Sequence, residues 1–237
     1  MGNLLKTEIK EFKKFAAVVI IAVVMLTANG CSETMATLTD VPKEEINAVH
    51  STVRILAGEE IGAGVIVKDS ERKSLTFMTI LTAGHVIEGV GTGAEVLVSF
   101  ADGKEAAGSV ETVFDEQGYD IGIVTVSYSD VPKKTLEFIS SSAIAGGEEE
   151  YNPQEFKIFD LSAGNGRYTS ITGNVESMNE YFYEFDKVLI RGKAEGISEG
   201  MSGSPLFDSR GELFGILVAG NDDGTVAAEN LVGKDIF

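Results

Sequence analysis

The 237-residue sequence contains one cysteine, no tryptophan and few basic residues. A single cysteine cannot form an internal disulfide, so core packing alone must hold the fold together. The absence of tryptophan, combined with 27 glycines, favours tight turns and short strands over long helices. Only 19 basic residues accompany 37 acidic ones, and a net charge of −18 argues against nucleic acid as a partner because such a surface repels phosphate.

The sequence also lacks an apolar run of bilayer-spanning length near its N-terminus. Residues 15–28 are uncharged and follow four lysines, Lys6, Lys10, Lys13 and Lys14. These 14 residues are fewer than the about 20 that a membrane-spanning helix needs. A basic stretch before a short apolar run is typical of an export signal, which we assign to residues 1–30.

The apolar run ends in Ala28-Asn29-Gly30-Cys31, which resembles the lipobox of bacterial lipoproteins. The resemblance implies that Cys31 carries a lipid and becomes the mature N-terminus. Asn29, and Ala28 where Leu is commoner, depart from the usual pattern, so a cleaved signal without lipid and a retained anchor stay open as alternatives. We expect an exported protein, tethered to a membrane of the cell envelope on its periplasmic or extracellular face.

After a polar tether at residues 31–49, which we expect to end in a short helical turn, the pattern is that of short strands. Runs rich in β-branched residues, bounded by Gly, Asp and Ser, predict strands. They lie at 52–56, 61–68, 77–81, 94–100, 106–113, 121–126, 155–161, 168–177, 186–191, 203–207, 212–219 and 224–228. We expect residues 127–154 to connect the two series of six strands, and residues 227–237 to form a short terminal helix.

Three short motifs carry the chemistry. Ser202 lies in Gly200-Met201-Ser202-Gly203-Ser204-Pro205, where a tight loop can expose its hydroxyl beside backbone N–H groups. His85 follows the apolar run at 77–81 in Thr-Ala-Gly-His-Val, where its ring can serve as a general base. Asp120 starts the sixth strand and can orient the imidazole, with Asp115 as the nearest rival acid.

These motifs, TAGHV, YDIGIVTV and GMSGSP followed by GELFGILVAG, resemble the signature blocks of trypsin-like (chymotrypsin-fold) serine peptidases, in the same order. The resemblance covers about residues 50–231. It implies an all-β fold of two six-stranded antiparallel barrels, at about 50–130 and 150–231 within a domain of residues 50–237. The active site would lie in the cleft between them. The lack of disulfides is more similar to bacterial and viral members than to digestive enzymes.

Carried over by position, the resemblance implies a role for each motif residue. Ser202 would be the nucleophile, His85 the general base and then general acid, and Asp120 the orienting carboxylate. The remaining residues of the implied site are Gly200 and Ser202 for the oxyanion hole, Val218, Ala219 and Gly220 for one wall of the substrate pocket, and Gly196 for its base. Neither a metal nor an organic cofactor is implied, and the substrate is a polypeptide.

Two positions depart from the family pattern. Met201 stands where many members have an aspartate that pairs with an N-terminus freed by activation cleavage, so we expect this chain to need no such cleavage. Ser204 replaces a second glycine, a change that should leave the chemistry alone. Because no charge is present at Gly196, we expect a small or apolar side chain before the scissile bond, although Glu199 near the oxyanion loop would alter that.

Other interpretations of the same residues remain. His50 has no motif around it and is expected to be an ordinary residue, residues 148–150 (three glutamates) a solvated loop, and Tyr181, Phe182, Tyr183 and Phe185 the edge of a hairpin. The leading hypothesis is a serine endopeptidase. The alternatives are a catalytically silent protease-like binding or assembly module and a small-molecule esterase.

Overall fold

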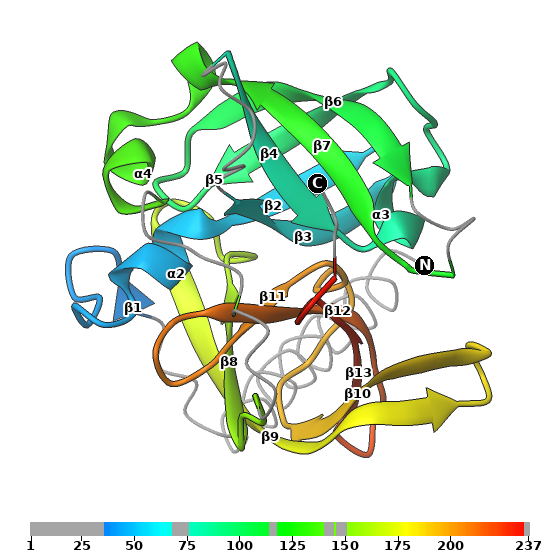
Figure 1. The fold of residues 1–237 in the computed structure, drawn as a ribbon. Helices are drawn as coiled ribbons and strands as arrows, with labels where there is room; N and C mark the ends of the chain where they lie inside the picture. The colour runs from blue at the N-terminus through cyan, green and yellow to red at the C-terminus, as the bar shows by residue number, and fades with distance from the viewer. Residues whose placement is uncertain (1–35, 68–75, 114–117, 140–144, 146–150, 235–237) are drawn as a thin grey trace, which may run out of the picture. The chain divides into compact units, whose positions relative to one another are not determined.

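The computed structural model describes residues 36–67, 76–113, 118–139, 145 and 151–234, all of which belong to one structural unit (Figure 1). The leader with Cys31, the rival acid Asp115 and the acidic run at residues 148–150 lie outside the described residues. None of the described helices is long and apolar enough to span a membrane.

Six antiparallel strands close the first barrel in the order β2-β3-β4-β7-β6-β5 (Figure 1). Their bounds are Thr52–Ala57 (β2), Glu60–Val67 (β3), Phe77–Thr82 (β4), Glu95–Phe100 (β5), Glu105–Val113 (β6) and Gly122–Ser127 (β7). Strand β5 shows the underlying pattern, since Val96, Val98 and Phe100 are buried whereas Glu95 and Leu97 are exposed. Alternate side chains of a strand point to opposite faces, so this sequence buries one face in the barrel.

A second closed ring of six strands follows, in the order β8-β9-β10-β13-β12-β11 with β11 returning to β8. Their bounds are Glu155–Asp160 (β8), Arg167–Phe182 (β9), Lys187–Ala194 (β10), Pro205–Phe207 (β11), Leu213–Gly220 (β12) and Thr225–Asn230 (β13). A short strand β1, Ala36–Thr37, pairs with the start of β9. The predicted all-β fold of two six-stranded antiparallel barrels is therefore confirmed.

The core of the second barrel is built around Phe156 on β8, which is 1% exposed. Two glycines on neighbouring strands make room for its ring. A β-carbon on Gly173 would overlap the ring, and one on Gly192 would lie 2.8 Å from it. Because a packed core admits no extra carbon at such distances, the sequence needs glycine at both positions.

The structure differs from the sequence-based prediction at several strand ends. The terminal helix predicted for residues 227–237 is wrong for the part described, because Thr225–Asn230 is the strand β13, paired with β12 and β10. Strand β13 lies between β10 and β12, and its apolar side chains are buried. This pairing and burial outweigh a weak local preference for helix. Strand β11 starts at Pro205, two residues later than predicted, because Gly203 has a φ of 87° and turns the chain.

Short helices lie between the strands: Ile46–Ser51 (α2), Gly84–Glu88 (α3), the 3₁₀ turn Tyr128–Asp130 (η3) and Lys133–Phe138 (α4). Helix α2 carries the fully buried His50, whose ring stacks on Phe138 of α4 with 4.8 Å between centroids. The predicted connection between the barrels thus contains η3 and α4.

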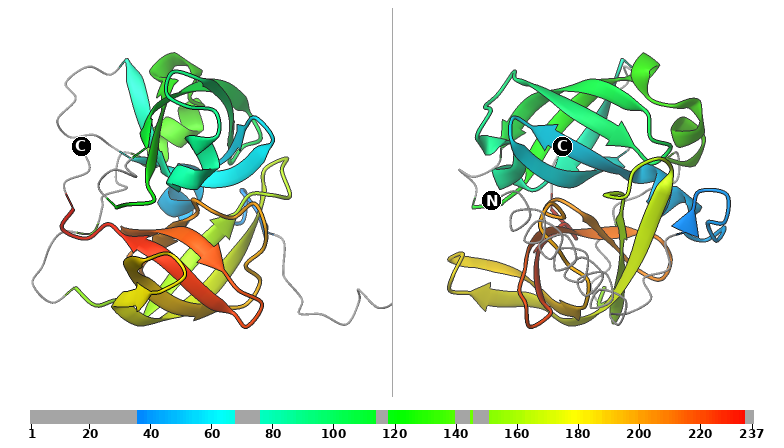
Figure 2. Two further views of the ribbon diagram at one scale, coloured as in Figure 1. Left: turned by 90° about the vertical axis from the view of Figure 1, so that its right-hand side faces the viewer. Right: turned by 180° about the vertical axis from the view of Figure 1, so that it is seen from behind.

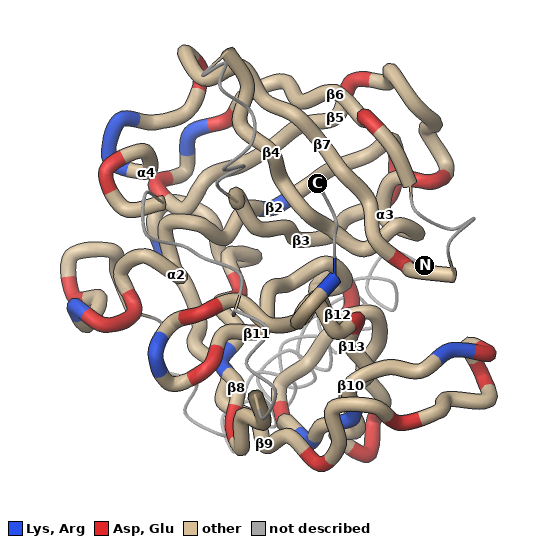
Figure 3. The backbone as a smooth tube through the Cα atoms, viewed as in Figure 1, with Lys and Arg blue, Asp and Glu red and all other residues tan. Residues whose placement is uncertain are grey.

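The β9–β10 pair continues beyond the second barrel as a hairpin (Figure 2). The aromatic cluster lies at its tip, where Tyr181, Tyr183 and Phe185 are exposed and Phe182 is buried. The interpretation of this cluster as a hairpin edge is confirmed. Acidic residues are distributed over loops of both barrels (Figure 3).

Candidate active site

His85 and Asp120 are joined by two hydrogen bonds. The Nδ1 atom of His85 lies 2.6 Å from Oδ2 of Asp120, and the backbone N–H of His85 donates to Oδ1 at 2.8 Å. An ionised carboxylate only accepts hydrogen bonds, so Nδ1 must carry the proton and Nε2 is left as the basic atom of the neutral ring. The His85 side chain is 44% exposed and that of Asp120 is 14% exposed. The pair therefore has its acid covered and its imidazole accessible.

The close approach of this pair depends on Gly84, the first residue of α3. A β-carbon there would lie 2.9 Å from Asp120 Oδ1 and 2.9 Å from Val113. Glycine lets the backbone of α3 come within hydrogen-bonding reach of the carboxylate. This explains the glycine before the histidine in the TAGHV motif.

The electrostatics of the pair favour its charged form. The hydrogen bond that His85 donates to Asp120 raises the pKa of His85 despite desolvation of the ring, and the charges of Asp120, Glu60 and Glu88 act in the same direction. Burial opposes ionisation of Asp120, but its hydrogen bonds with His85 and the charges of His85 and Lys187 together outweigh burial, and the pKa of Asp120 is lowered. Asp120 thus remains ionised and stabilises a proton on His85.

The loop that carries Ser202 is held from both barrels. The carbonyl oxygen of Ser202 accepts a hydrogen bond from the N–H of Ala63 on β3 at 2.7 Å, and the N–H of Gly203 donates to Leu217 on β12 at 2.8 Å. Gly203 has a φ of 87°, and a β-carbon on it would overlap the Ala63 carbonyl and the Thr82 hydroxyl. The loop is therefore packed against the end of β4.

This packing brings Ser202 near the chain segment that leads to His85. A β-carbon on Gly203 would lie 3.0 Å from the backbone nitrogen of Ala83, two residues before His85. The Ser202 hydroxyl itself donates to the carbonyl of Val218 at 3.3 Å. Among the described residues this is the hydrogen bond it makes, and it makes none to His85.

Two backbone amides of the same loop are free to act as donors. Within the part of the chain that the structure describes, neither Gly200 N–H nor Ser202 N–H has a hydrogen-bond acceptor. Gly200 has a φ of 84°, a left-handed conformation that favours glycine. An unsatisfied pair of N–H groups beside a hydroxyl is the arrangement that an oxyanion site needs.

Met201 anchors the loop through apolar burial. Its side chain is 2% exposed and belongs to the core of the second barrel, and its sulfur accepts a hydrogen bond from the N–H of Ser198 at 3.3 Å. The neighbouring Ser204 is also buried, at 1% exposed. Met201 and Ser204 are therefore buried on either side of Ser202 in this loop.

Of the residues predicted to form the substrate pocket, Gly196 precedes Ile197 in the chain and Gly220 lies against its side chain, whereas Val218 and Ala219 belong to a different apolar cluster. Gly196 has a φ of 85°, and a β-carbon on Gly220 would overlap the Ile197 side chain. Ile197 therefore lies directly against Gly220 at the end of β12. Val218 is 7% exposed and contacts Ala219 and β13 in a small apolar cluster.

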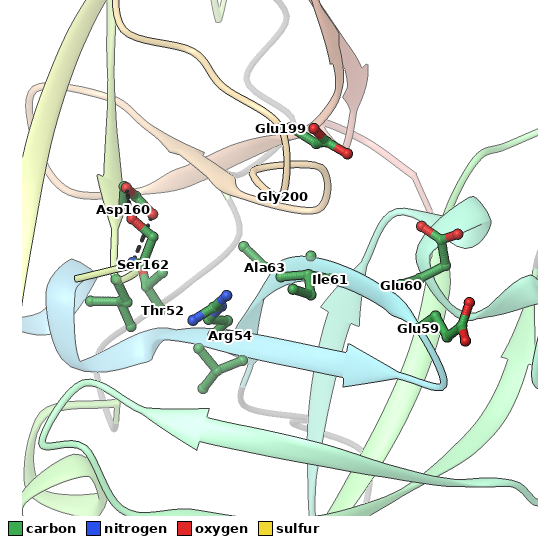
Figure 4. Close-up of a pocket in the computed structure, with 13 residues that line it drawn as sticks. Thr52, Arg54, Glu59, Glu60, Ile61, Ala63, Asp160, Ser162, Glu199 and Gly200 are labelled. Carbon is green, nitrogen blue, oxygen red and sulfur yellow. Dashed lines mark hydrogen bonds between the residues drawn. The ribbon is translucent and has the colours of Figure 1, made fainter. Parts of the chain in front are cut away.

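A separate pocket of about 280 Å³ adjoins Gly200, between the β2–β3 hairpin and residues 160–162 (Figure 4). Glu59 and Glu60 line one part of it, Arg54 lies between them and Asp160, and Glu199 lies on the side of Gly200 (Figure 4). Glu199 is thus placed in this pocket, next to the candidate oxyanion loop. No group of three or more His, Cys, Asp or Glu side chains in the described ranges is placed to hold a metal ion.

One contact at the site involves a residue that sequence analysis missed. The backbone N–H of Asp120 donates to Oε1 of Glu229 on β13 at 2.8 Å, across 109 residues. Glu229 is 1% exposed. The feature of the sequence that could have pointed to Glu229 is that it is the one acidic residue in the run of β13, next to small apolar residues.

Two antiparallel six-stranded barrels, with a His–Asp pair on the first and a glycine-bounded serine loop on the second, have the architecture of the chymotrypsin fold. The chain belongs to the family of trypsin-like peptidase domains, whose sequence pattern matches residues 62–216. The substrates of a peptidase are polypeptides, so this family gives the class of substrate to test.

Solved structures of proteases share the fold. The inactive form of the Rv3671c protease of M. tuberculosis has a TM-score of 0.57 and 18% identity over 80% of this chain and 87% of that one. The active form of the same protease has a TM-score of 0.56 and 18% identity, over 80% of this chain and 79% of that one. The serine endoprotease from Yersinia pestis has a TM-score of 0.55 and 18% identity, over 81% of this chain and 64% of that one. No curated protein sequence matches the chain.

The two histidines of the sequence, His50 and His85, provide a test of the His85–Asp120 pair by NMR titration. Because the hydrogen bond to Asp120 raises the pKa of His85, Asp120→Asn should lower the His85 titration midpoint. The pKa of His50 is lowered by burial, with smaller effects of Lys134 and Asp102, so its midpoint should not move. A His85 midpoint that is the same in both proteins would contradict the pairing.

Proposed function

We propose that the chain is a serine endopeptidase in which Ser202 is the nucleophile, His85 the general base and Asp120 the orienting acid. The observation that supports it best is the 2.6 Å contact between His85 Nδ1 and Asp120, which leaves the opposite ring nitrogen basic. The packing of the Ser202 loop against the strand that leads to His85 also supports this assignment.

In the first half-reaction the Ser202 hydroxyl rotates away from the Val218 carbonyl, a long bond at 3.3 Å, and attacks the scissile carbonyl carbon. Its proton passes to Nε2 of His85, which then gives it to the leaving amine as the C–N bond breaks. Water next attacks the acyl-enzyme while His85 takes its proton, and as the ester bond to Ser202 breaks His85 returns that proton to Oγ, which releases the acid product and restores the free hydroxyl. Asp120 stays ionised throughout and stabilises the imidazolium.

The amides of Gly200 and Ser202 would hold the oxyanion. Both are without an acceptor among the described residues, so no hydrogen bond must break before they bind the developing charge. A single donor of this kind is worth about 3 kcal/mol of transition-state stabilisation. Met201, buried in the barrel core, would keep these amides in position without a new N-terminus, so the proposal includes no activation cleavage.

The alternative of a catalytically silent module draws support from the Ser202 hydroxyl, which contacts Val218 and not His85. Hydrogen bonds of catalytic groups are often long or misaligned without substrate, so this geometry does not exclude catalysis. Labelling of the serine decides between the two functions.

A fluorophosphonate probe should label the wild-type protein at Ser202, and Ser202→Ala should abolish labelling and lower kcat for peptide cleavage by about 10⁶-fold. Ser204→Ala is the matched control and should still be labelled, because Ser204 is buried. Mass spectrometry of the labelled peptide identifies the site. Well-folded wild-type protein that takes up no probe would support the silent module, and labelling with hydrolysis of esters but not of peptides would support an esterase.

We further propose that Ile197 sets the size of the substrate side chain before the scissile bond. By resemblance, this side chain would enter between Gly196 and the wall formed by Val218, Ala219 and Gly220. Ile197 lies against Gly220 and narrows that space. This contact favours a small side chain over a bulky apolar one.

Ile197→Ala should therefore raise kcat/KM for peptides with Leu or Phe before the scissile bond, relative to Ala, by about tenfold or more. A peptide library analysed by mass spectrometry measures the change. Leu97→Ala, an exposed position on the first barrel, is the control and should keep the wild-type preference. An unchanged size preference in Ile197→Ala would rule out this role.

Export and tethering through Cys31 form the last part of the proposal, and they rest on the sequence of the leader. Mass spectrometry of the protein purified from membranes should find an N-terminal peptide that starts at lipid-modified Cys31. An unmodified Cys31 still joined to Gly30 would contradict lipidation. Export with cleavage at another position would support an ordinary signal.

A further inference from the structure

Glu229 is a buried carboxylate that the proposed mechanism does not use. On β13 the residues Val226 and Ala228 point into the core of the second barrel, whereas Ala227 belongs to a separate cluster on the opposite side. Alternation along a strand places Glu229 on the same side as Ala227, away from the barrel interior. Yet Glu229 is 1% exposed, so something outside its own barrel covers it.

The covering groups come from the segment that carries Asp120 and from the C-terminal turn. Glu229 Oε1 accepts the backbone N–H of Asp120 at 2.8 Å, and Oε2 lies 3.1 Å from Lys234 Nζ. Lys234 Nζ in turn lies 3.8 Å from the ring centroid of Tyr119. A buried carboxylate is costly unless it is hydrogen-bonded and its charge is compensated, and here both conditions are met.

Asp120 precedes β7, so its N–H takes no part in the strand ladder that begins at Gly122. Its carboxylate binds the ring and backbone of His85, while its amide is held by Glu229. One residue thus receives restraints from both barrels at once. Without the Glu229 acceptor, the Asp120 backbone would be free to shift and would carry the carboxylate away from His85.

We propose that Glu229 is a positioning residue, which fixes Asp120 from the second barrel and so sets the placement of His85 relative to Ser202. The inference rests on the proposed peptidase function for its kinetic consequence only. Strand β13 pairs with β12, where Leu217 and Ala219 lie opposite Ala228 and Ala227, and Val218 between them accepts the Ser202 hydroxyl. The same strand pair therefore holds the serine and the acid in fixed relation.

Two substitutions at Glu229 distinguish the effect of its hydrogen bond to Asp120 from the effect of filling the buried space. Glu229→Leu fills the space but removes the acceptor, and kcat should fall about 10–100-fold with KM changed less than about twofold, because misplacement affects the transition state more than substrate binding. Glu229→Gln keeps a carbonyl acceptor for the Asp120 amide and should restore most of the lost kcat. All rates are divided by the folded fraction measured by circular dichroism.

Asp208→Asn is the matched control. Asp208 is likewise a buried acid of the second barrel, but its partners Tyr151 and Arg210 hold a turn and contact none of the proposed catalytic residues. Its substitution should lower stability and leave kcat per folded molecule unchanged. An equal loss of kcat in the Asp208 and Glu229→Leu variants, or in Glu229→Gln and Glu229→Leu, would overturn the positioning role.

The His85 titration gives a readout that needs no turnover. Glu229→Leu should lower the His85 midpoint, as Asp120→Asn does, and Asp208→Asn should not. An unchanged His85 midpoint in Glu229→Leu would overturn the inference. If wild-type protein fails to react with a fluorophosphonate while the midpoint still shifts, the peptidase proposal falls and the positioning of Asp120 by Glu229 stands.

Discussion

The close approach of the two barrels at Gly203 is the constraint on which the rest of the site depends. There the backbone of the serine loop meets Ala63 and Thr82 with no room for a side chain, and the Ser202 carbonyl accepts the Ala63 amide. Gly62 fits the same contact, since a β-carbon on it would lie 2.8 Å from the Ser202 carbonyl oxygen. Glycines on both sides of the interface let hydrogen-bonded backbones take the place of packed side chains.

The hydrogen bond between Asp120 and Glu229 is a second contact between the two barrels at this site. The first barrel presents a histidine on a short helix, and the second presents a serine on a loop, and neither element is restrained by a strand ladder. Precise placement of such groups comes from the partners that fix them. Buried hydrogen bonds from β3, β12 and β13 supply those restraints.

The sequence alone was sufficient to locate most of the strands, because alternation of buried and exposed residues is a local pattern. Alternation such as that of β5 marks a buried face, and Gly84 and Gly203 mark positions where backbone must approach closely. The contacts of Asp120 with Glu229 and of Ser202 with Val218 were not predictable, since they depend on how strands that are separate in the sequence pack together. The wrong helix at the C-terminus has the same origin, because pairing with β12 and β10 overrides local preference there.

The two histidines also make the free energy of unfolding depend on pH. The buried His50 ring has no hydrogen-bond partner in the described structure, and burial lowers its pKa, so unfolding is favoured as pH falls below about 6.5. His85 acts in the opposite sense: its raised pKa adds stability that is complete below about 6.5 and is lost as pH rises through the folded-state value. The combined contribution of the two imidazoles to the free energy of unfolding therefore passes through a maximum near the ordinary imidazole pKa.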